Sequence, residues 1–285
     1  MKKTDILYSD MHMHGSFSDG RGSLREFAVS AIEKGFKAIG FSDHVPVPID
    51  NSWSMKLSDL GSYLEEADAL KKEFNGILEI YTGIELDYID GIDVLKYVDF
   101  ESRGFDYFIG SVHYVYSEIL GGHFEVDGPA ESFKSLFYSG FGGDAKALVH
   151  GYYNNVRKMV EEYKPTVVGH IDLIKKNNGI SEYFSEDSDF YKEEINETLD
   201  VIKKQGALLE INTGAISRGY TKIPYPSEYI LKKSLEKGIG ITLNSDAHQP
   251  SNVGYKFMEM IDMAKEKGFR EIYFYNQGQW KSFSL

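Results

Sequence analysis

Two histidines near the start of the chain, His12 and His14, stand two residues apart at the end of the first apolar run. On a β-strand, side chains two residues apart point to the same face, so both imidazoles can reach one point. Neutral imidazole is the commonest metal ligand in proteins. One His-x-His pair is a weak signal, because such pairs also occur on ordinary surfaces. The pair is informative here because five later apolar runs also end in His, Asp or Glu.

The residues at these run ends have side chains that bind divalent metal ions through nitrogen or oxygen. Six of the eight histidines in the chain are at such positions, which is more than a random distribution would place there. A single histidine of this set would more often be a hydrogen-bonded core residue, but the whole set favours a metal site. The nine candidate ligands are His12, His14, Asp19, His44, Glu85, His113, His170, Asp246 and His248. They exceed what one tetrahedral zinc ion binds, so we expect two or three divalent ions, with Glu85 able to bridge a pair.

Other titratable residues near these positions have more than one interpretation. His123 and His150 are not at strand ends, and we interpret them as surface or structural residues. Carboxylates beside metal-bound imidazoles often orient the ring. We interpret Asp10 and Asp172 in this way, with a plain structural hydrogen bond as a nearly equal alternative.

Composition limits the class of protein. The 285 residues, 42% of them hydrophobic, are enough for one large core. The formal net charge of -13 disfavours avid nucleic-acid binding, because proteins that bind the phosphate backbone normally present a basic face. The absence of cysteine excludes disulfides and thiolate metal sites. Residues 1–5 lack the apolar segment of a signal peptide and no run approaches membrane-spanning length, so we expect a soluble, cytoplasmic protein without membrane contact.

Seven short apolar runs alternate with segments of helical periodicity. The predicted strands cover residues 6–11, 37–41, 77–84, 105–112, 166–169, 207–211 and 239–243, with one more at 271–275. The predicted helices cover residues 23–32, 57–74, 92–102, 144–163, 190–205, 226–237 and 253–267, with Ser23 and Glu26 as a capping box and glycines 35, 206, 238 and 268 at helix ends.

This alternation predicts βαβ units and a parallel sheet. Seven such units close naturally into a barrel, so we expect an α/β fold, a distorted (β/α)7 barrel, in a single domain over residues 1–285. Active sites of such barrels lie at the carboxyl ends of the strands, where the candidate ligands are. Residues from about 114 to 143 interrupt the repeat, and we expect a long loop or lid that carries a short helix. Residues 175–186 are expected to form a loop.

Six motifs, in this order along the chain, resemble those of the PHP (polymerase and histidinol phosphatase) family. They are Asp10-Met11-His12-Met13-His14 with Ser18-Asp19-Gly20, Gly40-Phe41-Ser42-Asp43-His44, Gly83-Ile84-Glu85-Leu86-Asp87, Ser111-Val112-His113, Gly169-His170-Ile171-Asp172 and Asn244-Ser245-Asp246-Ala247-His248. The resemblance implies a distorted barrel of seven βα units and a cluster of up to three divalent ions. Chain length and the long segment after His113 are most similar to the histidinol-phosphate phosphatase branch, which acts in histidine biosynthesis.

The resemblance also implies which residues share each ion. The first ion would be held by His12, His14, Glu85 and Asp246. The second would be held by Glu85, His113 and His170, and the third by Asp19, His44 and His248. Some members of the family have a histidine at the position of Asp19. Sites of nitrogen and oxygen ligands accept zinc, manganese and iron, so the sequence does not select the metal.

The implied reaction is hydrolysis of L-histidinol phosphate. Two ions bridged by Glu85 would lower the pKa of a shared water and so provide a hydroxide that attacks phosphorus. Asp43 is a candidate acid for the leaving alkoxide. Arg218 follows a predicted strand, and its guanidinium would bind phosphate through two hydrogen bonds. Lys175 is a second phosphate-binding candidate, with a solvated loop lysine as the alternative.

Histidinol phosphate also carries an amine and an imidazole. Aromatic and acidic residues of the 114–143 segment are candidates to cover that end, although packing or solvent exposure explains them equally well: Tyr114, Tyr116, Glu118 and Phe124. One alternative function is a phosphoesterase of the same family that acts on a nucleotide, phosphosugar or phosphotyrosine. Another is a non-catalytic metal-binding domain, which the complete set of ligands disfavours. The oligomeric state stays open.

Overall fold

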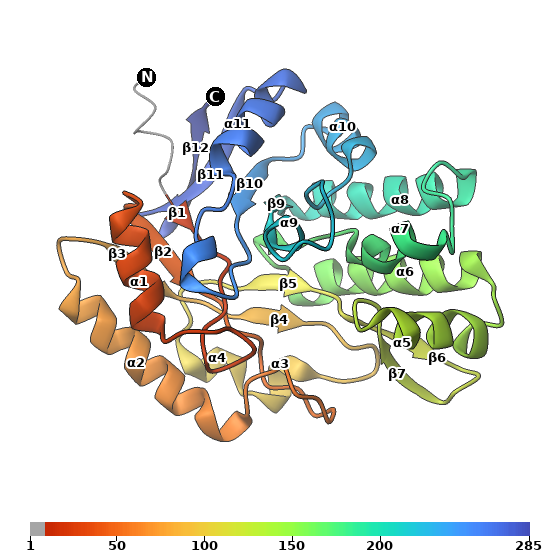
Figure 1. Cartoon of the computed structure of the whole chain (residues 1–285), viewed down its shortest axis with the longest axis horizontal. Coiled ribbons are helices and arrows are strands. Elements are labelled where there is room, and N and C mark those ends of the chain that lie inside the picture. The colour runs from red at the N-terminus through yellow and green to blue at the C-terminus, as the bar shows by residue number, and fades with distance from the viewer. Residues whose placement is uncertain (1–8) are drawn as a thin grey trace.

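The computed structural model describes residues 9–285, except for the side chains of residues 180 and 181. It is a single-domain α/β fold in which most neighbouring strands are parallel (Figure 1). One sheet has the order β1-β2-β3 and consists of β1 (Ser9–Asp10), β2 (Ala38–Phe41) and β3 (Glu79–Thr82). The predicted strand over residues 6–11 begins outside the described part of the chain, and residues 1–5 also lie outside it.

The second sheet has the order β12-β11-β10-β9-β8-β5-β4. Its strands are β4 (Glu85–Asp87), β5 (Ile109–Ser111), β8 (Val167–Val168), β9 (Leu208–Asn212), β10 (Ile241–Asn244), β11 (Glu271–Asn276) and β12 (Gln279–Ser284). All neighbouring pairs in it are parallel except β11 and β12. Parallel pairing places the carboxyl ends of these strands at one edge, as the sequence predicted.

Backbone contacts join the two sheets near the carboxyl ends of their strands. β3 and β4 are separated by residues 83–84 alone. An isolated parallel bridge pairs His44, just after β2, with Glu85 at the start of β4. A second one pairs Met13, just after β1, with Ala247, just after β10. The segments that carry candidate ligands in the two sheets therefore lie against one another.

Amphipathic helices lie outside the sheets and pack apolar faces on them (Figure 1). The long helices are α1 (Leu24–Glu33), α2 (Leu60–Glu73), α6 (Ala145–Tyr163), α8 (Asp189–Gln205), α10 (Glu228–Lys237) and α11 (Phe257–Glu266), and a short α9 (Gly214–Ser217) follows β9. The predicted capping box of Ser23 and Glu26 at the start of α1 is confirmed. Gly206 and Gly238 end α8 and α10 in the left-handed conformation, as predicted.

Two predicted segments were wrong in detail. The single helix expected over residues 92–102 is divided into α3 (Val94–Tyr97) and α4 (Phe100–Arg103), because Asp99 between them has a φ of 52°. The loop expected over residues 175–186 instead begins with a 3-10 helix, η4 (Leu173–Asn177), and continues as α7 (Asn178–Ser181).

Strand β12 was not predicted from the sequence. It pairs antiparallel with β11 through a two-residue turn, Gln277 and Gly278, in which both residues have positive φ. Such turns match the twist of the flanking strands and favour glycine. The sequence of β12 contains no apolar run that would predict a strand. Its residues are mostly polar, because this strand is at the edge of the sheet and no residue in it is fully buried.

Residues 114–143 contain more regular structure than the expected loop. An antiparallel hairpin of β6 (Tyr114–Ser117) and β7 (Gly122–Glu125) is followed by α5 (Ala130–Ser135), the expected short helix, and by a π turn (Leu136–Gly140). The hairpin is held to α6 because the side-chain amide of Asn155 donates to the carbonyl of Tyr114 at 3.1 Å. Within residues 9–285, no helix combines the length and the apolar character needed to cross a membrane.

Candidate metal centre

His12 and His14 lie directly after β1 and are fully buried. Met11 and Met13 alternate with them and belong to the apolar core, so the two histidines face the opposite way, as the spacing predicted. His14 Nε2 lies 3.2 Å and His12 Nε2 lies 3.9 Å from Asp246 Oδ1. The first two ligands therefore meet a carboxylate from the other end of the chain.

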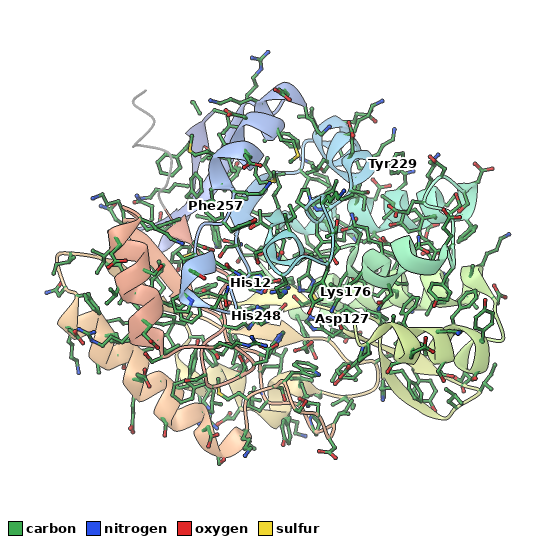
Figure 2. The ribbon with its side chains drawn as sticks, in the orientation of Figure 1. His12, Asp127, Lys176, Tyr229, His248 and Phe257 are labelled. Carbon is green, nitrogen blue, oxygen red and sulfur yellow. The ribbon has the colours of Figure 1, made fainter. Side chains whose placement is uncertain are left out.

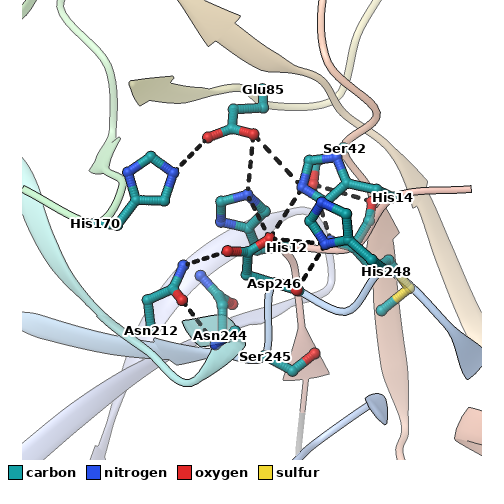
Figure 3. Close-up of polar contacts among 12 residues, drawn as sticks. His12, His14, Ser42, Glu85, His170, Asn212, Asn244, Ser245, Asp246 and His248 are labelled. Atoms are coloured by element: carbon teal, nitrogen blue, oxygen red, sulfur yellow. Dashed lines mark hydrogen bonds and ion pairs between the residues drawn. The ribbon is translucent and has the colours of Figure 1, made fainter. Parts of the chain in front are cut away.

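The carboxylate of Glu85 contacts imidazoles through both of its oxygens, and dashed lines join it to His170 and to His12 in Figure 3. Its Oε2 lies 3.0–3.5 Å from one imidazole nitrogen of each of three histidines, His12, His14 and His44. Its Oε1 lies 2.9 Å from His170 Nε2 and 3.8 Å from His113 Nε2. Each Glu85 oxygen thus faces a different group of imidazoles, which is the arrangement that a bridging ligand requires.

Asp19 and His248 complete the side of the cluster that faces solvent. Asp19 Oδ2 lies 3.1 Å from His248 Nε2, and Asp19 Oδ1 lies 3.9 Å from His44 Nε2. The loop that carries Asp19 depends on Gly20, because a Cβ at this position would lie 1.7 Å from the carbonyl oxygen of His14. A larger residue at position 20 would push Asp19 away from the histidines.

The buried polar atoms of the cluster fit divalent ions. Within the described part of the chain, several have no hydrogen-bond partner, namely His12 Nε2, His14 Nδ1 and Nε2, His44 Nδ1 and Glu85 Oε2. A buried polar atom without a partner costs about 1–3 kcal/mol, so a cluster of them indicates a ligand that accepts their lone pairs. The nine predicted residues form overlapping sets of three and four donors. Imidazoles and carboxylates without thiolates suit zinc, manganese or iron.

Burial and neighbouring charges shift the pKa values of the cluster in both directions, and despite burial the nearby carboxylates hold the pKa of His12 and of His44 well above its usual range. Burial, together with repulsion from His248 and His44, lowers the pKa of His14 to about 3. His14 is therefore neutral near pH 7 and has a lone pair for a metal. Burial raises the pKa of Glu85, but attraction to His44 and His12 outweighs burial and holds the pKa of this carboxyl well below its usual range. Glu85 therefore carries its negative charge.

Glu210, on β9, supports the cluster from behind and was missed in the sequence. Its Oε1 accepts a hydrogen bond from His12 Nδ1 at 2.7 Å, and its Oε2 accepts one from the backbone N–H of His170 at 3.0 Å. The side-chain amides of Asn212 and Asn244 also donate to it, both at 2.9 Å. These bonds direct His12 Nε2 toward Glu85. A carboxylate within the apolar run Leu208–Ile211 was the sequence signal for this role.

Asp10 and Asp172, which were predicted to orient histidines, bind backbone N–H groups instead. Asp10 accepts hydrogen bonds from the backbone N–H groups of Ser245 and Gly254, at 3.0 and 2.9 Å. Asp172 accepts from the backbone N–H of Ser227 at 2.8 Å. Both therefore hold backbone, which is the structural alternative given above. Asp87, like Glu210, does orient a predicted ligand, through a short hydrogen bond from Nδ1 of His113.

Asp43 is buried behind the cluster and does not line the cavity in front of it. Its Oδ1 accepts hydrogen bonds from the N–H of Gly15 and from the N–H and hydroxyl of Ser18, at 2.7–3.0 Å. Burial raises the pKa of Asp43 to about 6 despite these hydrogen bonds. The structure thus ties Asp43 to the loop that carries Asp19.

Arg218, at the end of α9, reaches the centre as predicted from its place after β9. Its Nη2 lies 3.0 Å from Asp246 Oδ2, and its Nη1 lies 2.6 Å from His248 Nδ1. Lys175 is not brought to the same place. It is buried, and its Nζ pairs with Asp172 Oδ2 at 2.6 Å.

The two histidines that were set aside lie apart from the cluster. His123, on β7, contacts the carbonyl oxygen of Asp90 through Nε2 at 2.8 Å. His150, on α6, is largely exposed, and its Nδ1 lies 2.7 Å from Glu194. Among the residues that the structure describes, neither belongs to a set of potential ligands.

A cavity of about 490 Å³ opens in front of the cluster. Seven of the nine predicted ligands line it, together with Arg218. Residues that the sequence did not single out also contribute to its walls, among them Arg21, Trp53, Glu125, Asp127 and Lys176. They come from four separate segments, so spacing along the chain gave no signal for them.

We expect Glu210→Gln to weaken metal binding about 10- to 100-fold, as losses of such supporting contacts do. The amide nitrogen of glutamine would face N–H donors that the carboxylate now satisfies. Zinc affinity, measured by competition with a chromogenic chelator, tests this. Glu194→Gln is the matched control, because Glu194 contacts His150 Nδ1 at the same 2.7 Å but outside the cluster. Equal affinity in both variants would contradict the role of Glu210.

Comparison with known proteins agrees with this geometry. A family model of the PHP domain matches residues 10–214. The chain is 31% identical over 268 residues to the "Probable histidinol-phosphatase" of Deinococcus radiodurans, covering 93% of this chain and 95% of that protein. It is 29% identical over 268 residues to the "Histidinol-phosphatase" of Bacillus subtilis, covering 89% and 98%.

A solved structure shares the fold. It is the histidinol phosphate phosphatase of Lactococcus lactis, crystallised with zinc, L-histidinol and phosphate, with a TM-score of 0.74 and 23% identity. The similarity covers 96% of this chain and 99% of that one. Because the family model spans well over half of the chain and the D. radiodurans relative aligns along nearly its whole length, this chain belongs to the PHP domain family.

Proposed function

We propose that this protein is a metal-dependent phosphomonoesterase that hydrolyses L-histidinol phosphate to L-histidinol and phosphate, a step of histidine biosynthesis. The observation that carries the proposal is the clustering of three carboxylates, Glu85 among them, with six imidazoles, beside a cavity lined by arginine. The curated relatives named histidinol-phosphatase, which align along most of the chain, support the substrate.

For three ions we propose the ligand sets that the family resemblance implies. The observed donor groups agree with two of these sets in part and place His113 and His170 in separate groups, each with Glu85. His12 and His14 would hold one ion with Glu85 and Asp246. The other two sets are His113 and His170 with Glu85, and His44 and His248 with Asp19. Within the described residues, His12, His14 and Asp246 form one group of donors within 4.8 Å of one another, and Asp19, His44 and His248 belong to another. Zinc, manganese and iron all suit these donors, and the crystal structure of the L. lactis relative contains zinc.

Bound divalent ions would supply an activated water and neutralise charge on the phosphoryl oxygens. The chain's own residues position the substrate. Arg218 has the planar fork that binds a phosphate oxygen pair, and it is held toward the centre by Asp246 and His248. Lys176 replaces Lys175 as the lysine that we place on the cavity wall. The loop that carries Asp19 separates Asp43 from the cavity. We therefore propose that Asp43 holds this loop in place and does not donate the proton to the leaving group.

We further propose that the two sheets form one distorted barrel of seven βα units. The order around the barrel would be β1, β2, then β3 and β4 together as one unit, and then β5, β8, β9 and β10. The parallel bridge between Met13 and Ala247 supports closure from β10 back to β1, and the bridge between His44 and Glu85 supports continuity from β2 to β4. Such closure brings strand ends from the whole chain to one rim.

We propose that the 114–143 segment is a lid over the substrate. Glu125, at the end of β7, lies on the cavity wall, and Asp127 and Gly128 follow it there. The site of action would be the cytoplasm, where the enzyme acts on a small phosphorylated molecule. With a formal net charge of -13, neither nucleic acid nor a membrane surface is the expected partner.

The deciding experiment measures phosphate release from L-histidinol phosphate against a panel of nucleotides, phosphosugars and phosphotyrosine, with metal analysis of the same sample. We expect the highest kcat/KM for L-histidinol phosphate and at least two bound ions per chain. A higher kcat/KM for another member of the panel would reject this substrate while keeping the phosphoesterase. Absence of activity in a metal-loaded sample would reject the enzyme.

We expect Arg218→Ala to raise KM for L-histidinol phosphate about 10- to 100-fold, because a charged hydrogen-bonding group contributes about 1.5–3 kcal/mol. Steady-state kinetics with metal in excess measures this. Arg25→Ala is the control, since Arg25 pairs with Glu73 on the exposed surface. Metal content must be measured too, because Arg218 also contacts Asp246. An unchanged KM would remove Arg218 from phosphate binding.

A further inference from the structure

The cavity has walls of opposite charge. Arg21 and Arg218 line it close to His248 and Asp246. Glu125 and Asp127 line it where the 114–143 segment meets the rest of the fold. In Figure 2, Asp127 and Lys176 lie on the side of the molecule that carries this segment, while His12 and His248 lie nearer its middle. A molecule that fills the cavity therefore meets arginines at one part of its wall and the carboxylates of the 114–143 segment at another.

Glu125 is connected to the metal ligands through one aromatic ring. The indole N–H of Trp53 donates to Glu125 Oε1 at 2.7 Å. The same indole packs against His44 and His113, with ring centroids 4.6 and 5.5 Å apart. Over residues 9–285, no hydrogen bond to the second oxygen of Glu125 is found, so Oε2 keeps its capacity to accept one. Glu125 is thus fixed in position while one oxygen stays available to a ligand.

Asp127 is fixed by η4 on the other side. Lys176 Nζ donates to the carbonyl oxygen of Asp127 and lies 3.5 Å from its Oδ2. Asn177 Nδ2 donates to the carbonyl of Gly128 at 3.0 Å. Lys176 also lies over the ring of Tyr220, 4.6 Å from its centroid. Lys176 thus pairs with Asp127, and among the described residues no cation pairs with Glu125, so this wall keeps the negative charge of Glu125.

We propose that Glu125 and Asp127 are specificity residues that bind the protonated amine of the substrate's alcohol portion. The substrate class is then a phosphomonoester of an amino alcohol, with phosphate at the arginine wall and the cation at the carboxylate wall. This inference rests on the proposed phosphatase function and explains why the enzyme would select a substrate that carries an amine. A neutral or anionic alcohol portion would leave Glu125 without a counter-charge, which disfavours nucleotides and phosphosugars. The residues suggested by the sequence, such as the exposed Tyr116 and Glu118, are not on this wall.

The test uses the isosteric double variant Glu125→Gln/Asp127→Asn in the metal-loaded enzyme. We expect KM for L-histidinol phosphate to rise about 10- to 100-fold, as for loss of a charge-assisted hydrogen bond. We expect kcat to change less than about threefold, because the interaction is the same in ground and transition states. For phenyl phosphate, which carries no cation, KM should stay unchanged. Equal losses on both substrates would overturn the proposal, because they would indicate a structural effect.

Product inhibition separates the two ends of the cavity. The double variant should be inhibited more weakly by L-histidinol and as strongly as wild type by inorganic phosphate. Glu131→Gln is the matched control, since Glu131 lies in α5 of the same segment and its side chain is 88% exposed. Unchanged inhibition by L-histidinol in the double variant would overturn the proposal.

Failure of the proposed substrate would be distinguishable from failure of this inference. If wild type hydrolyses other phosphomonoesters better than L-histidinol phosphate, the same variants are compared on 2-aminoethyl phosphate and ethyl phosphate. A preference for the amine in wild type that the double variant loses supports the carboxylate wall. The same ratio in both proteins overturns it, whatever the natural substrate is.

Discussion

Glu85→Gln is expected to reduce kcat by more than about 1000-fold, equivalent to roughly 4 kcal/mol of transition-state stabilisation. Glu85 is the residue whose two oxygens face different groups of imidazoles, with His12 and His44 on one side and His170 on the other. Glutamine has the same shape, but it is neutral and offers one oxygen where the carboxylate offers two. It therefore cannot serve two ions at once.

Phosphate release and metal content of the Glu85→Gln protein are the measurements. We expect at least one ion fewer per chain and a far-ultraviolet circular dichroism spectrum like that of wild type. Glu131→Gln, which removes one exposed carboxylate, should retain full activity and metal content. Wild-type turnover by a metal-depleted Glu85→Gln protein would refute the metal-dependent mechanism.

Removal of metal is expected to abolish activity and to lower Tm by about 10 °C. An ion that binds the native state alone stabilises it by about 4 kcal/mol when its concentration is 1000 times Kd. In a domain of this size, 1 kcal/mol corresponds to roughly 2–4 °C in Tm. The stabilisation has a physical origin in the cluster, where, among the described residues, buried atoms of His12, His14, His44 and Glu85 have no hydrogen-bond partner.

Differential scanning calorimetry with a chelator, followed by titration with zinc or manganese, measures this effect. Tm should rise again with the logarithm of metal concentration, and activity should return in parallel. Glu85→Gln provides the control, because its Tm should respond less to the same titration. A Tm and an activity that are both insensitive to prolonged chelation would contradict a metal centre.

The sequence by itself determined the residues that can bind metal and the rim on which they lie. Because side chains in extended backbone alternate, His12 and His14 point to the same side of the segment after β1. Because strands alternate with helices along the chain, the segments that carry the candidates follow the carboxyl ends of parallel strands. Local chemistry determined the helix boundaries in the same way, since Ser23 with Glu26 and Gly206 act on backbone groups within a few residues. Such features are readable because their cause lies within one turn or one strand.

Tertiary structure alone decided which carboxylate supports which imidazole. Glu210 accepts a hydrogen bond from His12 across 198 residues of sequence, whereas Asp10, two residues from His12, holds the backbone near Ser245. It also placed Lys176 rather than Lys175 on the cavity wall, because successive side chains in the 3-10 helix η4 point about a third of a turn apart. Contacts of this kind depend on how closely separate segments approach one another in the folded protein. The spacing of residues along the chain does not determine those distances.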